Sequence, residues 1–263
     1  AAINLRLKEG AKHKWIGTLK AYAGMSPDEG LWNGQGTFMR FTRKSQSLNT
    51  LKSNNTGEDT SKELRSFDVN EVRNQRNLLP DYVDVTPPYS MGLHRDRELM
   101  NTTHQLTTHN LFKLKNGGDV KVSLTYQHHT EEAYRETESV YYEDGQKEWV
   151  VSDAEESEFT QNALMATFST ERNESTYNLS ERFSVNMDWT ERDISLSGQE
   201  DNIQDLYGGS KKLVNNLYLL KRNKNQFYNL SSYTVFHSNP QNIRVQAIDR
   251  NLEQKVNPVQ FFT

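Results

Sequence analysis

The feature that most constrains this chain is an alternation of apolar and polar side chains from Tyr177 to Trp189. The odd positions are apolar except for Glu181, and the even positions are all polar. Because successive side chains of a strand point to opposite faces, the pattern predicts a strand with one apolar and one polar face. The segment is longer than a typical strand of about 5–6 residues. It is long enough to cross a bilayer at a barrel tilt, which takes about 9–11 residues.

Weaker versions of the pattern predict about ten strands in all, joined by connections of two kinds. Short polar turns near 10–13, 43–45, 116–119, 172–175 and 223–226 join the strands of each pair. Longer connections, near 25–31, 55–103, 130–158, 191–211 and from 238 to the end, separate the pairs. This rhythm is typical of an outer-membrane β-barrel with short periplasmic turns and long outer loops. The expected strands are 3–8, 15–23, 32–42, 46–54, 105–115, 120–127, 159–171, 177–189, 212–222 and 227–237.

Composition agrees with a barrel that is apolar on one face only. Hydrophobic residues make up 34% of the chain, which is low for a compact soluble domain, while 10% aromatic residues argue against disorder. The net charge of −4 is spread along the chain and gives no basic field for nucleic acid, and there are no cysteines. We therefore predict an all-β, antiparallel up-and-down meander that forms part of a transmembrane barrel. A soluble β-sandwich that binds a ligand is the alternative.

The barrel prediction assigns a direction to individual side chains. The even positions of 177–189 should face the lumen, notably Asn178, Arg182, Asn186 and Asp188. Their apolar neighbours should face lipid, as should those of 120–124; these are Leu179, Phe183, Val185, Met187, Val120, Val122 and Leu124. Trp15, Trp32 and Trp189 stand at ends of expected strands, where aromatic girdles lie in membrane barrels.

No residue pattern in the chain predicts a catalytic, cofactor or metal site. His128 and His129 precede Glu131 and Glu132, but adjacent strand residues point to opposite faces, so a solvated strand end is the simpler interpretation. The acidic run 153–158 lacks the spacing of a calcium loop and is interpreted in the same way.

Three aromatic residues in the expected loop 130–158 are candidates for binding. Tyr141, Tyr142 and Trp149 could contact a ligand or a partner protein, or they could pack the loop's own small core.

Several short motifs, in order along the chain, resemble TonB-dependent outer-membrane receptors. The closest likeness is to the large type, which carries a regulatory carboxypeptidase-like domain before the plug. The motifs are INLRLK at 3–8, KWIGTLKAYAG at 14–24, MRF at 39–41, NNTG at 54–57, THN at 108–110 and YNL at 228–230.

The resemblance implies a nutrient-uptake receptor of the bacterial outer membrane, without enzymatic activity and without a cofactor. Expected partners are outer-membrane lipid, TonB acting through a plug that is missing here, and a surface lipoprotein. Family barrels have about 22 strands, so the chain is expected to be an excerpt that continues in both directions. A ten-stranded outer-membrane hydrolase is a further alternative, because His128, His129 and His237 lie near expected loop-side strand ends.

Overall fold

The computed structural model describes residues 13–27, 29–58, 60, 79–85, 88, 92, 98–115, 117–143, 146–198 and 201–263. The expected strand 3–8 and the turn 10–13, apart from residue 13, lie outside these residues. No helix within the described ranges is long and apolar enough to cross a membrane.

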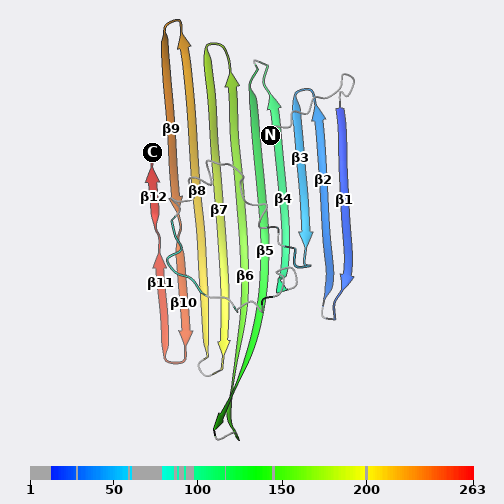
Figure 1. Ribbon diagram of the computed structural model, residues 1–263, viewed down its shortest axis with the longest axis vertical. Helices are drawn as coiled ribbons and strands as arrows, with labels where there is room; N and C mark the ends of the chain where they lie inside the picture. The colour runs from blue at the N-terminus through cyan, green and yellow to red at the C-terminus, as the bar shows by residue number, and fades with distance from the viewer. Residues whose placement is uncertain are drawn as a thin grey trace.

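The chain forms one antiparallel sheet of 12 strands in which neighbours in sequence are almost always neighbours in space (Figure 1). The sheet is open, with β1 at one edge and β11 and β12 at the other. The strands are β1 His13–Met25, β2 Gly30–Thr42, β3 Ser45–Asn54, β4 Met100–Lys113, β5 Asp119–Glu143, β6 Gln146–Asn173, β7 Tyr177–Ser197, β8 Asn202–Asn223, β9 Gln226–Ser238, β10 Gln241–Ala247, β11 Arg250–Val256 and β12 Val259–Phe262.

The all-β antiparallel meander predicted from the sequence is confirmed. Each expected strand between residues 15 and 237 falls on one of β1–β9, although 105–115 overruns the end of β4 at Lys113. Short turns join β2 to β3, β4 to β5, β6 to β7 and β8 to β9, as expected. The β8–β9 turn needs a left-handed residue, and Lys224 supplies it with φ of 44°.

The end of the chain, expected to be a connection, instead forms β10, β11 and β12. β8 pairs with β9 through residues 211–223 and with β10 through residues 202–208. β9 and β10 therefore act as one strand that is interrupted at Pro240, and β11 and β12 are interrupted in the same way at Pro258. Proline has no N–H for the ladder, which explains both breaks and the missed strands.

The prediction of long loops at 130–158 and 191–211 is wrong for most of each range, because strands occupy these residues instead. β5 runs to Glu143 and β6 starts at Gln146, so the two strands form a hairpin that projects beyond the rest of the sheet (Figure 1). β7 and β8 likewise continue to Ser197 and from Asn202. Backbone pairing continues here although the pattern of 177–189 does not. In β7 the apolar positions change face, to Ile194 and Leu196, and the prediction relied on alternation with a constant apolar face.

The sheet has two faces of opposite character. Residues 55–58, Thr60 and residues 79–85 of the β3–β4 connection pack on one face, which we call the covered face; the other is the open face. Apart from Gly36, the strand residues that are buried share the covered face by register, and most are polar. They are Asn54, Asn101, Thr103, Gln105, Gln127, His129, Ser157, Ala163, Ile194, Val235, His237 and Gln241.

Large apolar side chains are exposed on the open face instead. Aromatic and aliphatic side chains follow one another across the strands, so the usual inside–outside arrangement is inverted. The most exposed on this face include Trp15, Leu19, Trp32, Phe38, Leu51, Leu106, Phe112, Val122, Leu124, Tyr126, Phe168, Phe183, Trp189, Tyr228 and Leu230.

A row of carboxylates crosses the open face beyond Trp189. Glu158, Asp193 and Asp205 are direct cross-strand partners in β6, β7 and β8. One Asp193 oxygen is buried and accepts no hydrogen bond from the described residues. Burial raises the pKa of Asp193, and repulsion from Glu191, Asp205 and Glu158 raises it further. Like charges placed directly opposite one another destabilise a sheet.

Asp193→Asn is therefore expected to stabilise the fold at neutral pH. A carboxyl group whose pKa is raised on folding favours the folded state at acid pH, and this contribution is lost as pH rises through the folded pKa. The denaturant midpoint of the variant should exceed that of the parent at pH 7, and the difference should shrink toward pH 3. An Asp193→Asn midpoint equal to the parent's at pH 7 would contradict this account.

Candidate functional site

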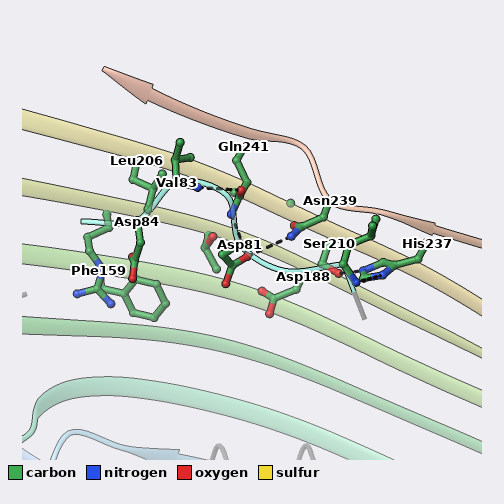
Figure 2. Close-up of a pocket in the computed structure, with 15 residues that line it drawn as sticks. Asp81, Val83, Asp84, Phe159, Asp188, Leu206, Ser210, His237, Asn239 and Gln241 are labelled. Atoms are coloured by element: carbon green, nitrogen blue, oxygen red, sulfur yellow. Dashed lines mark hydrogen bonds between the residues drawn. The ribbon is translucent and has the colours of Figure 1, made fainter. Parts of the chain in front are cut away.

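A short coil from the β3–β4 connection lies on the covered face over β7, β8, β9 and β10. We call residues 79–85 the capping segment. Its hydrogen bonds to the sheet come from residues more than 150 positions away in sequence, as in the bond of Leu79 to His237 with a sequence separation of 158. Figure 2 shows the segment passing over the side chains of β7–β10.

Two amides next to the Pro240 interruption hold the capping segment in place. The Gln241 Oε1 atom accepts from the backbone N–H of Tyr82 at 2.7 Å and of Val83 at 3.4 Å. Gln241 Nε2 donates to Asp81 Oδ1 at 2.9 Å, and Asn239 Nδ2 donates to the same oxygen at 3.1 Å. Both side chains are buried, so these bonds are shielded from water.

His237 bridges the capping segment and β8. Its Nδ1 atom lies 3.2 Å from the backbone nitrogen of Leu79, and its Nε2 atom lies 3.0 Å from the Ser210 hydroxyl. A backbone N–H can only donate, so Nδ1 is the acceptor and Nε2 carries the proton. Nε2 therefore donates to Ser210 and cannot also take the hydroxyl proton. The pair is a structural bridge, in contrast to the arrangement that activates a nucleophilic serine.

A cavity of about 370 Å³ lies between the capping segment and the sheet (Figure 2). Asp188 Oδ2 accepts from Gln161 Nε2 at 2.8 Å, whereas Asp188 Oδ1 is buried with no hydrogen bond from the described residues. The lining residues are Leu79, Asp81, Val83, Asp84, Phe159, Asp188, Thr190, Arg192, Leu206, Gly208, Gly209, Ser210, His237, Asn239 and Gln241.

Arg192 forms the far wall of this cavity. Its guanidinium carbon lies 4.4 Å from the centre of the Phe159 ring, a cation–π contact. Burial lowers the pKa of Arg192, while the carboxylates of Glu131 and Asp84 act in the opposite direction. Arginine nevertheless stays protonated at any physiological pH. The cavity thus presents carboxylates, amides and one cation, a mixture suited to a polar solute with several hydrogen-bonding groups.

A second polar cluster lies farther along the covered face, under residues 55–58 and Thr60. Asn101 accepts from the backbone N–H of Gly57 at 2.9 Å and donates to the Thr103 hydroxyl at 2.7 Å. The Thr103 hydroxyl lies 2.8 Å from Nδ1 of His129, and Thr60 donates to Gln127 at 3.3 Å. Both polar atoms of the Gln105 amide are buried without a hydrogen bond from the described part of the chain.

The four residues predicted to face the lumen share the covered face. Asn178, Arg182, Asn186 and Asp188 have the same parity in β7, and Asp188 lines the cavity under the capping segment. Of the four, only Asp188 is part of that cavity.

The histidine pair behaves partly as expected. His128 and His129 face opposite sides: His128 contacts Asn162 on the open face, and His129 contacts Thr103 on the covered face. The expectation of a solvated strand end is wrong for His129, which is 7% exposed, because residues 55–58 and Thr60 lie on its side of the sheet.

The three candidate aromatic residues lie on the projecting β5–β6 hairpin. Tyr141 and Trp149 are cross-strand partners whose rings stack with centroids 5.1 Å apart. Both rings remain about half exposed, and Tyr142 is more exposed still. The stack fits the view that these residues pack on one another, and their exposure leaves a surface free for a ligand or partner.

Sequence reasoning missed most of the residues that line the cavity. Asp81, Asn239 and Gln241 carry no alternation signal, because they lie in a coil or next to a proline break. The available signal was the sequence Ser238–Asn239–Pro240–Gln241, polar residues around a proline directly after a strong strand.

No group of three or more His, Asp or Glu side chains within the described residues is placed to hold a metal ion. No protein-family model matches the sequence, and no curated protein matches it.

Replacing Gln241 tests whether its amide holds the capping segment. Gln241→Leu keeps the size of the side chain but removes the hydrogen bonds to Asp81, Tyr82 and Val83. Losing buried hydrogen bonds of this kind costs about 1–3 kcal/mol, so amide exchange at Tyr82 and Val83 should accelerate roughly 5- to 150-fold.

Gln246→Leu, at an exposed position of the same strand, is the matched control and should leave this exchange unchanged. Equal protection of Tyr82 and Val83 in the parent and Gln241→Leu would show that other contacts hold the segment.

Proposed function

We propose that this chain is part of an outer-membrane β-barrel that takes up a polar solute. The observation that carries the proposal is the inversion of the sheet, with polar side chains on the covered face and large apolar ones on the open face. In water this arrangement exposes apolar area at a cost of about 25 cal/mol per Å². In a bilayer the same face is the favourable one.

The apolar stretch of the open face has aromatic ends, which supports a membrane orientation. In β7 it runs from Tyr177 to Trp189, and acidic side chains follow at Glu191 and Asp193. Indole rings prefer the boundary between the hydrocarbon and the water. The covered face would then line the lumen, and the cavity under the capping segment would lie on the solute's path.

The capping segment gives the proposed lumen a constriction. A connection folded onto the polar face narrows the passage and brings Asp81 and Asp84 opposite Asp188 and Arg192. Such a mixed set of charges and amides selects a polar solute by hydrogen bonding, and no bond has to be made or broken. His237 also favours transport over the hydrolase alternative, because its Nε2 atom donates to the Ser210 hydroxyl and cannot accept that hydroxyl's proton.

The specific type of receptor rests on the sequence motifs alone. By that resemblance the chain belongs to a TonB-dependent nutrient receptor, with a plug that transmits energy from the inner membrane. A surface lipoprotein is then a candidate partner for the projecting hairpin, where Tyr134, Tyr142 and Trp149 are exposed.

A pair of arginine substitutions at adjacent positions of β7 tests the membrane placement. Val185→Arg puts a charge on the open face, where the bilayer midplane imposes a cost of about 2–4 kcal/mol. Ser184→Arg puts the same charge on the covered face and should be tolerated. Each substitution would be made in the whole barrel protein of which the chain is proposed to be part, which would be folded into phospholipid vesicles and its stability measured by urea titration.

Expression in cells gives a second readout of the same pair. Val185→Arg should deplete the protein from the outer-membrane fraction, and Ser184→Arg should not. Equal losses for the two variants, or equal stability in vesicles, would contradict the proposal.

A further inference from the structure

A second hollow, of about 440 Å³, lies on the opposite side of the sheet from the capped cavity. It forms where the Pro240 and Pro258 interruptions break the outer strands. Its side chains come from β7, β8, β10 and β11, and Trp189, Tyr207 and Lys211 all point to the open face by register. These three side chains therefore face away from the proposed solute path, although Gly208, Gly209 and Gln241 line both hollows.

The lining of the hollow combines aromatic rings with positive charge. Trp189 and Tyr207 form its aromatic side, and Lys211 and Lys255 are its charged residues. None of the described residues that line it is acidic. Asn242 adds an amide between Tyr207 and Lys255, with which it is paired in register.

The two lysines are not equivalent. Lys255 lies 2.9 Å from the Glu253 carboxylate, which offsets part of its charge, although an ammonium has three donors and keeps others available. Lys211 is exposed and is the cross-strand partner of Met187. Met187 is the residue next to Trp189 on the open face of β7, on the side of the apolar stretch. Lys211 should therefore contribute more to anion binding than Lys255.

The hollow lies at a boundary along the strands. On one side the open face carries Met187, Val185 and Leu213, and on the other it carries Glu191 and Asp205. A lysine near such a boundary extends its ammonium toward the polar side while its methylenes stay on apolar surface. An occupant must therefore be an amphiphile with an anionic head at the lysines and apolar chains on the Met187 side.

We infer that this hollow binds the phosphate headgroup of an anionic membrane lipid, whose acyl chains lie along the apolar open face. The inference rests on the proposed membrane placement and adds a specific lipid site to it. A free phosphate would use the lysines but would leave the aromatic rings and the adjoining apolar surface without a role. Each lysine near an anionic lipid contributes about fivefold in affinity.

Quenching of Trp189 fluorescence by brominated lipids tests the inference. The whole barrel protein of which this chain is proposed to be part would be folded into phosphatidylcholine vesicles that contain either brominated phosphatidylglycerol or brominated phosphatidylcholine. The signal of Trp189 is isolated by subtracting the emission of a Trp189→Phe variant. Phosphatidylglycerol should be preferred at least fivefold at this site.

Three lysine variants assign the preference to the hollow. Lys211→Gln should lower the preference for phosphatidylglycerol about fivefold, and Lys255→Gln should lower it by less. Lys221→Gln, exposed on the same face of the same strand at its other end, is the matched control and should leave it unchanged.

The outcomes separate this inference from the proposed function. Equal quenching by the two brominated lipids would overturn the lipid site while leaving the membrane placement intact. Loss of the preference on adding millimolar inorganic phosphate would also overturn it, in favour of a free-anion site. If no brominated lipid quenches any tryptophan in the folded protein, the membrane placement itself fails, and the lipid site with it.

Discussion

The pairing register of the central strands is the constraint on which the rest of the structure depends. Side chains alternate with a period of two, so a slip of one residue would move every polar side chain of a strand to the open face. The register runs without a shift through β4, β5, β6, β7 and β8 until the bulge at Tyr141 and Tyr142 in the projecting hairpin. It aligns Gln105, Gln127, Ala163 and Asp188 in one row across the covered face, and it places Leu106, Tyr126, Leu164 and Met187 in the adjacent row on the open face.

A buried polar face has to be supplied with hydrogen bonds, and the β3–β4 connection supplies many of them. Each buried polar group left without a partner costs about 1–3 kcal/mol. Gln241 and Asn239 meet this requirement by binding the backbone and Asp81 of the capping segment, and Asn101 meets it by binding Gly57. Gln105 and one oxygen of Asp188 remain without such bonds from the described residues. A polar solute on the covered face would bind most favourably at these positions, because it could supply the missing hydrogen bonds.

Alternation in the sequence predicted the sheet, the positions of β1–β9 and the common face of Asn178, Arg182, Asn186 and Asp188. It could do so because these strands carry apolar side chains on the open face and polar side chains on the covered face. It failed in the extensions of β5, β6, β7 and β8, where the apolar side chains, such as Ile194, do not continue the pattern of the open face. It also failed where a proline interrupts a strand, at Pro240 and Pro258. The capped cavity could not be predicted, since Asp81 and Gln241 meet across a sequence separation of 160. Burial of His129 depends in the same way on a distant connection.

The arrangement of layers favours the proposed membrane barrel over the soluble sandwich. A β-sandwich places its second layer on the apolar face of the first. Here the second layer, formed by the described parts of the β3–β4 connection, lies on the polar face, and the apolar face is exposed. Among the described strands the sheet is open, so β1 and the β11–β12 edge each have one neighbour and expose backbone donors and acceptors. Hydrocarbon cannot satisfy these groups. The proposed function therefore requires that both edges pair with further strands, because only a closed ring of strands leaves no backbone group facing lipid.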